Sequence, residues 1–283
     1  MLEREKVFGH KFLGLISIVV NKFWDITKIN LFSIIFYLPS FVILFFLLIM
    51  AVPSDIDMLA NTLMYTIEDA ALVDTLVRLA IGLVFMTIPI VVFGPAVAGS
   101  ANVFKNIIEG NPTHTWTLFI QTLKKHFLKA FIISTIGTIV LFISLLSLRL
   151  WLQLANKAEV VTEGLMKFLL ENSMFYGVII FVMIGFIIIF LMMHFYIYQL
   201  LIQYDLTIMQ LYKYSYTFAI LRFFPNLFIL IACAILTILP FWIHYLFGGG
   251  MMFLVTFGLC GLIVNYYTWP AIEKHFEPLT NKK

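Results

Sequence analysis

The chain alternates between long apolar runs and short segments that hold nearly all of its charged residues. Its longest run, residues 223–272, contains no Asp, Glu, Lys or Arg. A helix rises about 1.5 Å per residue, so about 20 apolar residues cross the hydrocarbon core of a bilayer. The run is therefore long enough for two crossings, and the three glycines at 248–250 predict the turn between them. We infer an all-α, polytopic transmembrane helical bundle.

Five charge-free runs predict six spans, because the last run divides at its glycines. The other four runs cover residues 29–54, 79–104, 130–148 and 172–204. The fourth exceeds the length of a bare crossing, so its tyrosine-rich end is expected to reach the membrane interface. The chain is treated as a single membrane domain, 1–283. Its expected spans are residues 30–52, 79–103, 130–148, 173–203, 225–246 and 251–270.

Lys and Arg predict the orientation of these spans. Four of the 18 lie on one side, namely Arg78, Arg149, Lys157 and Lys167, and the other fourteen lie on the side of the two termini. Cytoplasmic loops carry the excess of Lys and Arg, so both termini are expected in the cytoplasm of a bacterial plasma membrane. The basic residues scattered before residue 28 are not followed by the compact apolar region of a signal peptide, so cleavage is not expected.

Three segments outside the spans place apolar residues at helical spacing and predict amphipathic cytoplasmic helices. They are residues 7–24 within the interfacial segment 1–28, residues 115–129, and residues 205–222, which start at a candidate N-cap, Asp205. The last stripe runs through Leu206, Met209, Tyr212, Tyr216 and Ile220. The last two segments occupy equivalent places between spans. This placement fits either a parallel repeat of spans 2–3 and 4–5 or two similar hairpins that arose by chance.

Composition agrees with this class and argues against catalysis. The chain is 62% hydrophobic and 12% charged, against about 25% charged in soluble domains. It contains no nucleophile elbow, zinc-protease motif, phosphate loop or CxxC pair. We therefore expect no enzymatic activity, cofactor, metal site or nucleic-acid partner. Cys233 and Cys260 lie inside apolar runs, so neither a disulfide nor a zinc site is expected.

The sequence leaves the roles of the acidic segment and of two histidines open. The acidic segment 53–78 is either a cation site or, as the lack of EF-hand spacing favours, a solvated outer loop with a short helix. His194 and His244, each towards the end of a span, are either interfacial histidines, which their aromatic neighbours favour, or a ligand or proton shuttle. Asn265 is expected in the inner aromatic belt. The spans contain no charged residue, which argues against a proton relay or a voltage sensor.

The second expected span carries a distinctive series of helix-breaking and small residues. Prolines remove backbone donors, and glycines let another backbone approach closely. The series is either a broken helix that exposes carbonyls to a solute or a kink packed against the first span, and we favour the packed kink. The residues assigned to kink and packing are Pro39, Pro89, Gly94, Pro95 and Gly99.

Several of these strings resemble the YesL-like bacterial membrane proteins. The similar strings are Asn30-Leu31-Phe32 with Tyr37-Leu38-Pro39, Phe93 to Gly99, Asn102 to Asn106, Lys124 to Ala130, and Tyr204-Asp205-Leu206 with Phe224 to Leu227. The similarity covers about residues 28–130 and 192–230, while the outer segment 53–88 and the length of the fourth span depart from it. The resemblance implies a largely uncharacterised family of Gram-positive bacteria, often encoded beside carbohydrate ABC importers and their sensor kinases.

The resemblance and the amphipathic segments together suggest an accessory membrane subunit of a carbohydrate ABC uptake system. The alternatives are a small-solute channel or carrier, or a structural or immunity-type membrane protein. The expected partners are the lipid bilayer and ABC importer subunits, and the oligomeric state is left open. The expected contact residues are cytoplasmic, aromatic or basic: Trp116, Lys124, Lys125, Phe127, Tyr212, Lys213 and Tyr216.

Overall fold

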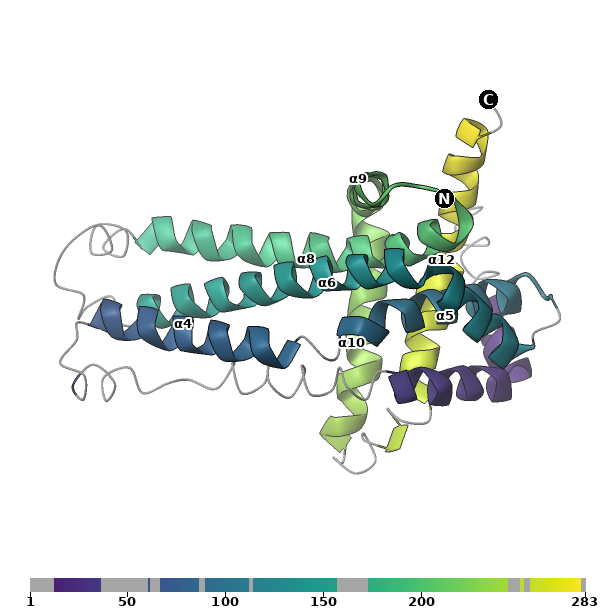
Figure 1. Cartoon of the computed structure of the whole chain (residues 1–283), viewed down its shortest axis with the longest axis horizontal. Coiled ribbons are helices and arrows are strands. Elements are labelled where there is room, and N and C mark those ends of the chain that lie inside the picture. The colour runs from purple at the N-terminus through teal and green to yellow at the C-terminus, as the bar shows by residue number, and fades with distance from the viewer. Residues whose placement is uncertain are drawn as a thin grey trace. The chain divides into compact units, whose positions relative to one another are not determined.

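The computed structural model describes residues 13–36, 61, 67–86, 90–111, 114–156, 173–243, 250–251 and 255–280. None of these residues lies in a strand, and the all-helical class is confirmed for them. Residues 13–36 are helical with a turn at Lys22. The further helices are α4 (Ile67–Met86), α5 (Ile90–Ile108), α6 (Thr115–Asn156), α8 (Ser173–Gln203), α9 (Ile208–Leu221), α10 (Phe223–Ile243) and α12 (Phe257–Thr280) (Figure 1).

Within the part of the chain that the structure describes, three helices are long and apolar enough to cross a bilayer, which indicates membrane association. They cover Thr115–Gln153 of α6, Tyr176–Gln203 of α8 and Phe223–Pro240 of α10. The bounds of α8 coincide with the expected fourth span, and those of α10 lie close to the fifth. Most of the first expected span lies outside the described residues, and so does most of the glycine turn.

Three expected boundaries differ from the structure. The amphipathic segment 115–129 and the span 130–148 form one continuous helix, α6, because no Pro or Gly interrupts the chain between Thr115 and Ile136. A change from polar to apolar composition does not by itself end a helix. The second expected span is divided between α4 and α5, whose described ends flank residues 87–89. The expected helix 7–24 likewise continues beyond its predicted end, since helical structure extends to residue 36.

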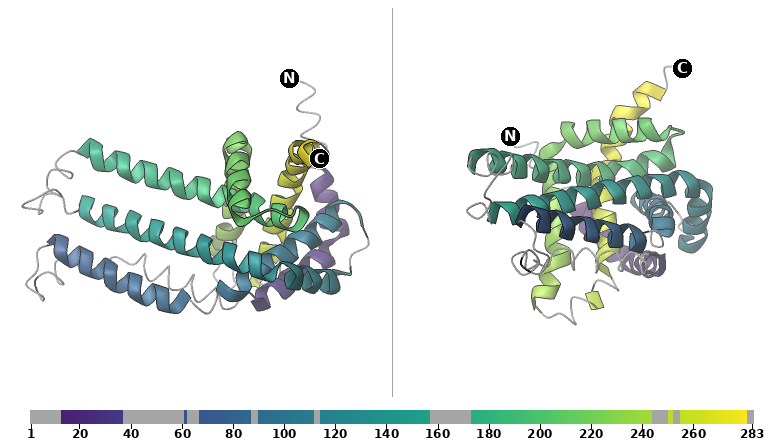
Figure 2. Two further views of the ribbon diagram at one scale, coloured as in Figure 1. Left: turned by 45° about the horizontal axis from the view of Figure 1, so that its top comes forward. Right: turned by 60° about the vertical axis from the view of Figure 1, so that its left-hand side comes forward.

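The chain divides into two units, described separately here. Unit 1 comprises Met1–Tyr37, Val92–Ile133 and Leu191–Lys283, and unit 2 comprises Leu38–Val91 and Ser134–Phe190. In unit 2, α4 runs alongside the parts of α6 and α8 that belong to this unit (Figure 2). Asp74 of α4 accepts hydrogen bonds from Arg78, at 2.9 Å, and from Arg149 of α6, at 2.7 Å. These partly buried ion pairs tie α4 to α6.

The core of unit 1 forms on both sides of α5, whose small residues allow close packing. One cluster joins Ala98 and Ala101 to residues of α6, α8, α9 and α12, with Tyr196 of α8 fully buried among them. The other joins Ala96 to Phe119 of α6, to α12 and to the N-terminal helical segment. Alanine side chains keep the interaxial distance short, so these helices can surround α5.

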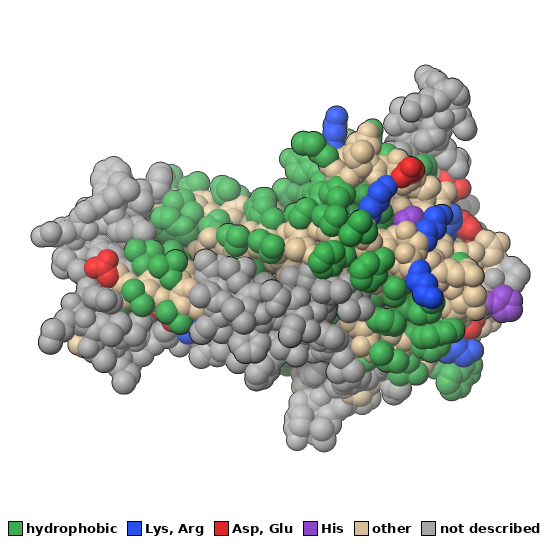
Figure 3. Space-filling view, viewed as in Figure 1, with side chains coloured by type: hydrophobic (Ala, Val, Ile, Leu, Met, Phe, Trp, Pro, Cys, Tyr) green, Lys and Arg blue, Asp and Glu red, His purple; other side chains and the backbone are tan. Residues whose placement is uncertain are grey.

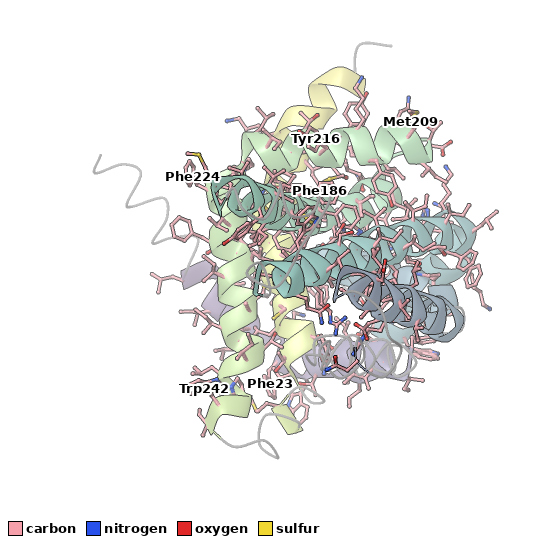
Figure 4. All side chains as sticks on the ribbon, turned by 90° about the vertical axis from the view of Figure 1, so that its left-hand side faces the viewer. Phe23, Phe186, Met209, Tyr216, Phe224 and Trp242 are labelled. Carbon is pink, nitrogen blue, oxygen red and sulfur yellow. The ribbon has the colours of Figure 1, made fainter. Side chains whose placement is uncertain are left out.

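Helix α10 presents an apolar stripe outward from unit 1. The stripe consists of exposed residues three or four apart: Phe224, Phe228, Ile231, Ile235, Ile238 and Trp242. Phe224 and Trp242 mark its two ends (Figure 4). The 18-residue apolar segment of α10 is about 27 Å long, which matches the thickness of a hydrocarbon core. A stripe of this length and composition is typical of a lipid-facing surface.

Candidate interaction surface around helix α9

Helix α9 begins at a capping box. Thr207 is its N-cap: the Thr207 hydroxyl accepts a hydrogen bond from the backbone of Gln210 at 3.3 Å, and the Gln210 side chain accepts one from the Thr207 backbone at 3.0 Å. The two bonds satisfy backbone donors that a helix start leaves without intrahelical partners. The prediction of Asp205 as the N-cap is wrong. Asp205 lies two residues before Thr207, and its carboxylate accepts a hydrogen bond from Lys129 of α6 instead.

The other end of α9 is fixed by Asn226, one of the first residues of α10. Its amide nitrogen donates to the carbonyls of Phe218 and Ala219, both at 3.3 Å, in the last turn of α9. Its amide oxygen accepts from the Tyr196 hydroxyl of α8 at 2.6 Å. The Arg222 guanidinium at the elbow donates to the Tyr267 carbonyl of α12 at 3.0 Å. The elbow between α9 and α10 is therefore held by α8 and α12.

Two polar contacts attach α9 to α6. The Lys129 ammonium lies 2.7 Å from the Asp205 carboxylate and 3.2 Å from the Leu206 carbonyl. The hydrogen bond and charge of Lys129 lower the pKa of Asp205. About one turn into α9, the Tyr212 hydroxyl donates to the Ile133 carbonyl at 3.1 Å, and burial raises the pKa of Tyr212 to about 12. The structure thus places Tyr212 within the contact between α9 and α6.

The contacts divide α9 into an inner and an outer face. The inner face buries Leu211, Ser215, Phe218 and Ala219. The outer face consists of Met209, Lys213, Tyr216 and Ile220, all of which are exposed. Met209 is 84% exposed and Tyr216 52% exposed. The expected stripe held Met209, Tyr216 and Ile220, and these residues lie on the face that unit 1 leaves uncovered.

Helix α9 lies across the end of α10 that carries Phe224 (Figure 4). Because α10 has the length of a bilayer crossing, a helix at its end would lie at the level of the interface if α10 crosses the bilayer. On the face of unit 1 seen in Figure 3, Lys and Arg side chains lie among apolar ones around α9 and the first half of α6. The outer face of α9 is thus apolar with a basic surround.

The other expected contact residues lie along the first half of α6. Lys124, Lys125 and Phe127 are exposed. Trp116 is 50% exposed, and one edge of its ring packs on Phe32 with centroids 4.8 Å apart. From Trp116 to Lys129 the helix rises about 20 Å, so Trp116 is remote from the α9 contact. Lys124, Lys125 and Phe127 lie within two turns of Lys129 along α6, whereas Trp116 lies at the far end of this half of the helix.

The expected packing residues of α5 are buried. Gly94, Pro95 and Gly99 lie in the described part of α5, while Pro39 and Pro89 lie outside the described residues. A Cβ atom built on Gly99 would lie 2.9 Å from Cδ2 of Phe119 and 3.0 Å from its carbonyl oxygen. Glycine at this position allows α6 to pack directly on α5.

Sequence reasoning missed several residues that hold this surface. The pair Thr207 and Gln210 has capping-box spacing, which is a readable signal. No local sequence pattern around Asn226 indicates its bonds to α8 and α9. Within the described ranges, no group of three or more His, Cys, Asp or Glu residues is placed to hold a metal ion.

The fold and the surface define a helical, membrane-associated chain in which hydrogen bonds hold α9 at both of its ends. A family described as "Protein of unknown function, DUF624" matches residues 59–148, from before α4 to within α6. This family is the YesL-like one, so the resemblance is supported over residues 59–148. The match includes residues 59–88 of the outer segment that was expected to depart from the family, and it does not extend to the similar strings within 192–230. No curated protein and no solved structure matches the chain.

Proposed function

We propose that the chain is a non-catalytic integral membrane protein that acts as an accessory subunit of a carbohydrate ABC uptake system. The observation that supports a partner is the outer face of α9. Hydrogen bonds at both ends and in the middle hold this helix, yet Met209 and Tyr216 remain exposed. A rigid apolar face loses little conformational entropy on binding. The kind of partner is inferred from the family resemblance.

The proposed topology has six spans with both termini in the cytoplasm of a bacterial plasma membrane. Support comes from the fourteen Lys and Arg residues on the terminal side and from the bilayer-matched length of α10. In this topology α9 lies at the cytoplasmic interface, where the ATPase subunits of an importer would be accessible to it.

The composition of the outer face favours a protein partner over lipid alone. Binding energy in protein interfaces concentrates on aromatic and other large side chains, whereas attraction to anionic lipid depends on clusters of Lys and Arg. The outer face of α9 has one cation, Lys213, among Met209, Tyr216 and Ile220. Lys124 and Lys125 on α6 are the residues that a lipid surface would use.

The test is affinity purification of the tagged chain in mild detergent, with partners identified by mass spectrometry. The double variant Met209→Ala and Tyr216→Ala retains every charge. It should lower recovery of importer subunits about tenfold or more, while the chain stays in the membrane fraction. The matched control is Phe228→Ala with Ile235→Ala, which removes exposed apolar side chains from the lipid-facing stripe and should leave recovery unchanged.

A second set of variants separates protein from lipid. A triple variant removes the three lysines: Lys124→Gln, Lys125→Gln and Lys213→Gln. It should weaken the attraction of this surface to anionic lipid but should retain most of the partner recovery. If recovery depends on the lysines alone, or if no importer subunit is recovered with the parent chain, the accessory role is wrong and the chain is a stand-alone membrane protein.

A further inference from the structure

The first half of α6 forms one wall of a surface pocket in unit 1. The pocket has a volume of about 190 Å³. Sites for drug-sized ligands occupy about 300–1,000 Å³, so this pocket admits a smaller group of a few heavy atoms. Most of its described lining is polar, and the apolar remainder comes from α6 and α8. The polar residues are Asn102 of α5 and, from α6, Gln121, Thr122, Lys125 and His126.

Helical spacing brings the four polar side chains of α6 to the same wall. Gln121 and Lys125 are four residues apart, and so are Thr122 and His126, so the two pairs form adjacent rows on one face of the helix. Lys124 is the neighbour of Lys125 in the sequence and is also exposed, but it does not line the pocket. Of these two adjacent lysines, only Lys125 belongs to the pocket.

A hydrogen bond between α5 and α6 fixes the part of the wall around Asn102. The Thr122 hydroxyl donates its hydrogen to the Leu118 carbonyl at 2.8 Å, so it must accept the 2.7 Å bond from the Asn102 amide nitrogen. This bond uses one of the two hydrogens of the amide nitrogen. Asn102 therefore contributes a donor to the pocket wall from α5, opposite the row on α6.

The charge of the pocket is positive. Neither Asp nor Glu is among the described residues of its lining. The charged groups that act on His126 are Lys125, Lys129 and Asp205. Lys129 lies 2.7 Å from Asp205, so these two opposite charges pair with each other. Within the described chain Lys125 makes neither an ion pair nor a hydrogen bond, so its charge is left without a counter-ion.

These features define the ligand by its chemistry. An ammonium group without a counter-ion, in a lining without a described carboxylate, favours an anion and disfavours a cation. Gln121 and His126 also make no hydrogen bond within the described chain, and both side chains can donate one. Donors on two helices suit an anion with several oxygens, and phosphate is such an anion.

The position of the pocket along α6 indicates the source of the phosphate. Residues 130–148 carry no charge and rise about 28 Å, which matches a hydrocarbon core of about 30 Å. Lys125 and His126 lie just before this run, at headgroup level when the run crosses the bilayer. Basic pockets between membrane helices at this level bind phospholipid headgroups. We propose that this pocket binds the phosphate of an anionic phospholipid, with Lys125 as its counter-ion and Gln121 and His126 as further donors.

The proposal goes beyond a general attraction of lysines to lipid and does not rest on the accessory role. A diffuse attraction would involve Lys124 and Lys125 equally, whereas a defined site depends on Lys125. Met209 and Tyr216 of α9 are not part of the described lining. The test below contains no second protein, so its failure and the failure of the accessory role are distinguishable.

The test is native mass spectrometry of the delipidated full chain in detergent. The chain is titrated with phosphatidylglycerol or with phosphatidylcholine of the same acyl chains. The first phosphatidylglycerol should bind at least about tenfold more tightly than the first phosphatidylcholine, whose headgroup brings its own cation next to Lys125. Lys125→Gln should weaken the first phosphatidylglycerol about tenfold. The matched control Lys124→Gln removes the neighbouring charge and should change this affinity less than about twofold.

A second pair of variants tests the geometry of the pocket apart from its charge. At pH 8 a histidine side chain is ordinarily neutral, so His126→Leu removes a donor and no cation. It should weaken the first phosphatidylglycerol about threefold or more. The matched control is His114→Leu, because His114 is exposed and does not line the pocket. Lys125 is exposed as well, so Lys125→Gln should keep the melting temperature of the parent chain and tests the site even if His126→Leu fails to fold.

Inorganic phosphate distinguishes the two sources of the same anion. At a concentration equal to that of the lipid it should leave the first phosphatidylglycerol bound, because it has no acyl chains to contact the helices. Displacement at this concentration would assign the pocket to free phosphate and overturn the lipid proposal. The proposal is also overturned if phosphatidylglycerol binds no more tightly than phosphatidylcholine, or if the two variants of either pair have equal effects.

Discussion

Single side chains decide where α9 starts, and the local sequence contains the signal for this start. Thr207 and Gln210 satisfy each other's backbone donors. Thr207→Ala should lower the free energy of unfolding in detergent by about 1 kcal/mol, measured by thermal denaturation. Thr217→Ala is the control, since this exposed α9 threonine bonds only the carbonyl of Lys213 and should have a much smaller effect. Equal destabilisation by both variants would contradict the capping role.

Glycines that look alike in the sequence differ in what surrounds them. Gly99 faces Phe119 at 2.9 Å from an added Cβ, whereas Gly185 in α8 has nothing within 4 Å. Gly99→Ala should destabilise the chain by about 1–3 kcal/mol through overpacking. Gly185→Ala should be neutral or stabilise it by up to about 1 kcal/mol through helix propensity. The measurement is the melting temperature of each purified variant, and a stable Gly99→Ala would remove the packing assignment of this position.

The element scale shows which structures are predictable from local pattern. The apolar run 172–204 predicts α8 because composition alone distinguishes a long span. The division of α6 into an amphipathic helix and a span was wrong because a change from polar to apolar composition does not end a helix, and α6 continues from Thr115 to Asn156. The face that α9 buries was not predictable, since both of its faces are apolar and the choice depends on α6 and α8.

The contact between α9 and α6 should respond to pH at its tyrosine. Tyr212 has a pKa raised to about 12, above the usual value of 10, because burial disfavours the phenolate. Its contribution to stability is therefore fully present below pH 10 and is lost as the pH rises from 10 through 12. Tyr212→Phe should abolish this part of the alkaline loss and, at neutral pH, cost about 1 kcal/mol for the hydrogen bond to Ile133.

The matched control is Tyr216→Phe, which removes an exposed phenol from the outer face of the same helix. Chemical unfolding of the three proteins at pH 8 and pH 11 makes the comparison. If Tyr212→Phe and Tyr216→Phe show the same alkaline loss as the parent chain, Tyr212 does not couple α9 to α6 through its hydroxyl.

At the scale of the whole molecule, the sequence predicts that the chain associates with a membrane but does not predict its long-range contacts. Arg149 and Asp74 are 75 residues apart and form a 2.7 Å ion pair that no local spacing suggests. One cavity of unit 1 is lined by residues of the N-terminal segment, α5, α8, α10 and α12, which lie far apart in the sequence. Such sites depend on tertiary packing, whereas hydropathy and charge bias depend on the chain alone.

The predicted topology is testable on the whole chain with single cysteines in a background of Cys233→Ser and Cys260→Ser. Glu163→Cys lies on the side with few basic residues and should react with an impermeant thiol reagent on intact cells. Asn281→Cys and the α9 variant Thr217→Cys should react only after the membrane is opened, because the basic side is cytoplasmic. The reverse pattern would invert the orientation, move the outer face of α9 outside the cell, and remove the basis for its contact with a cytoplasmic partner.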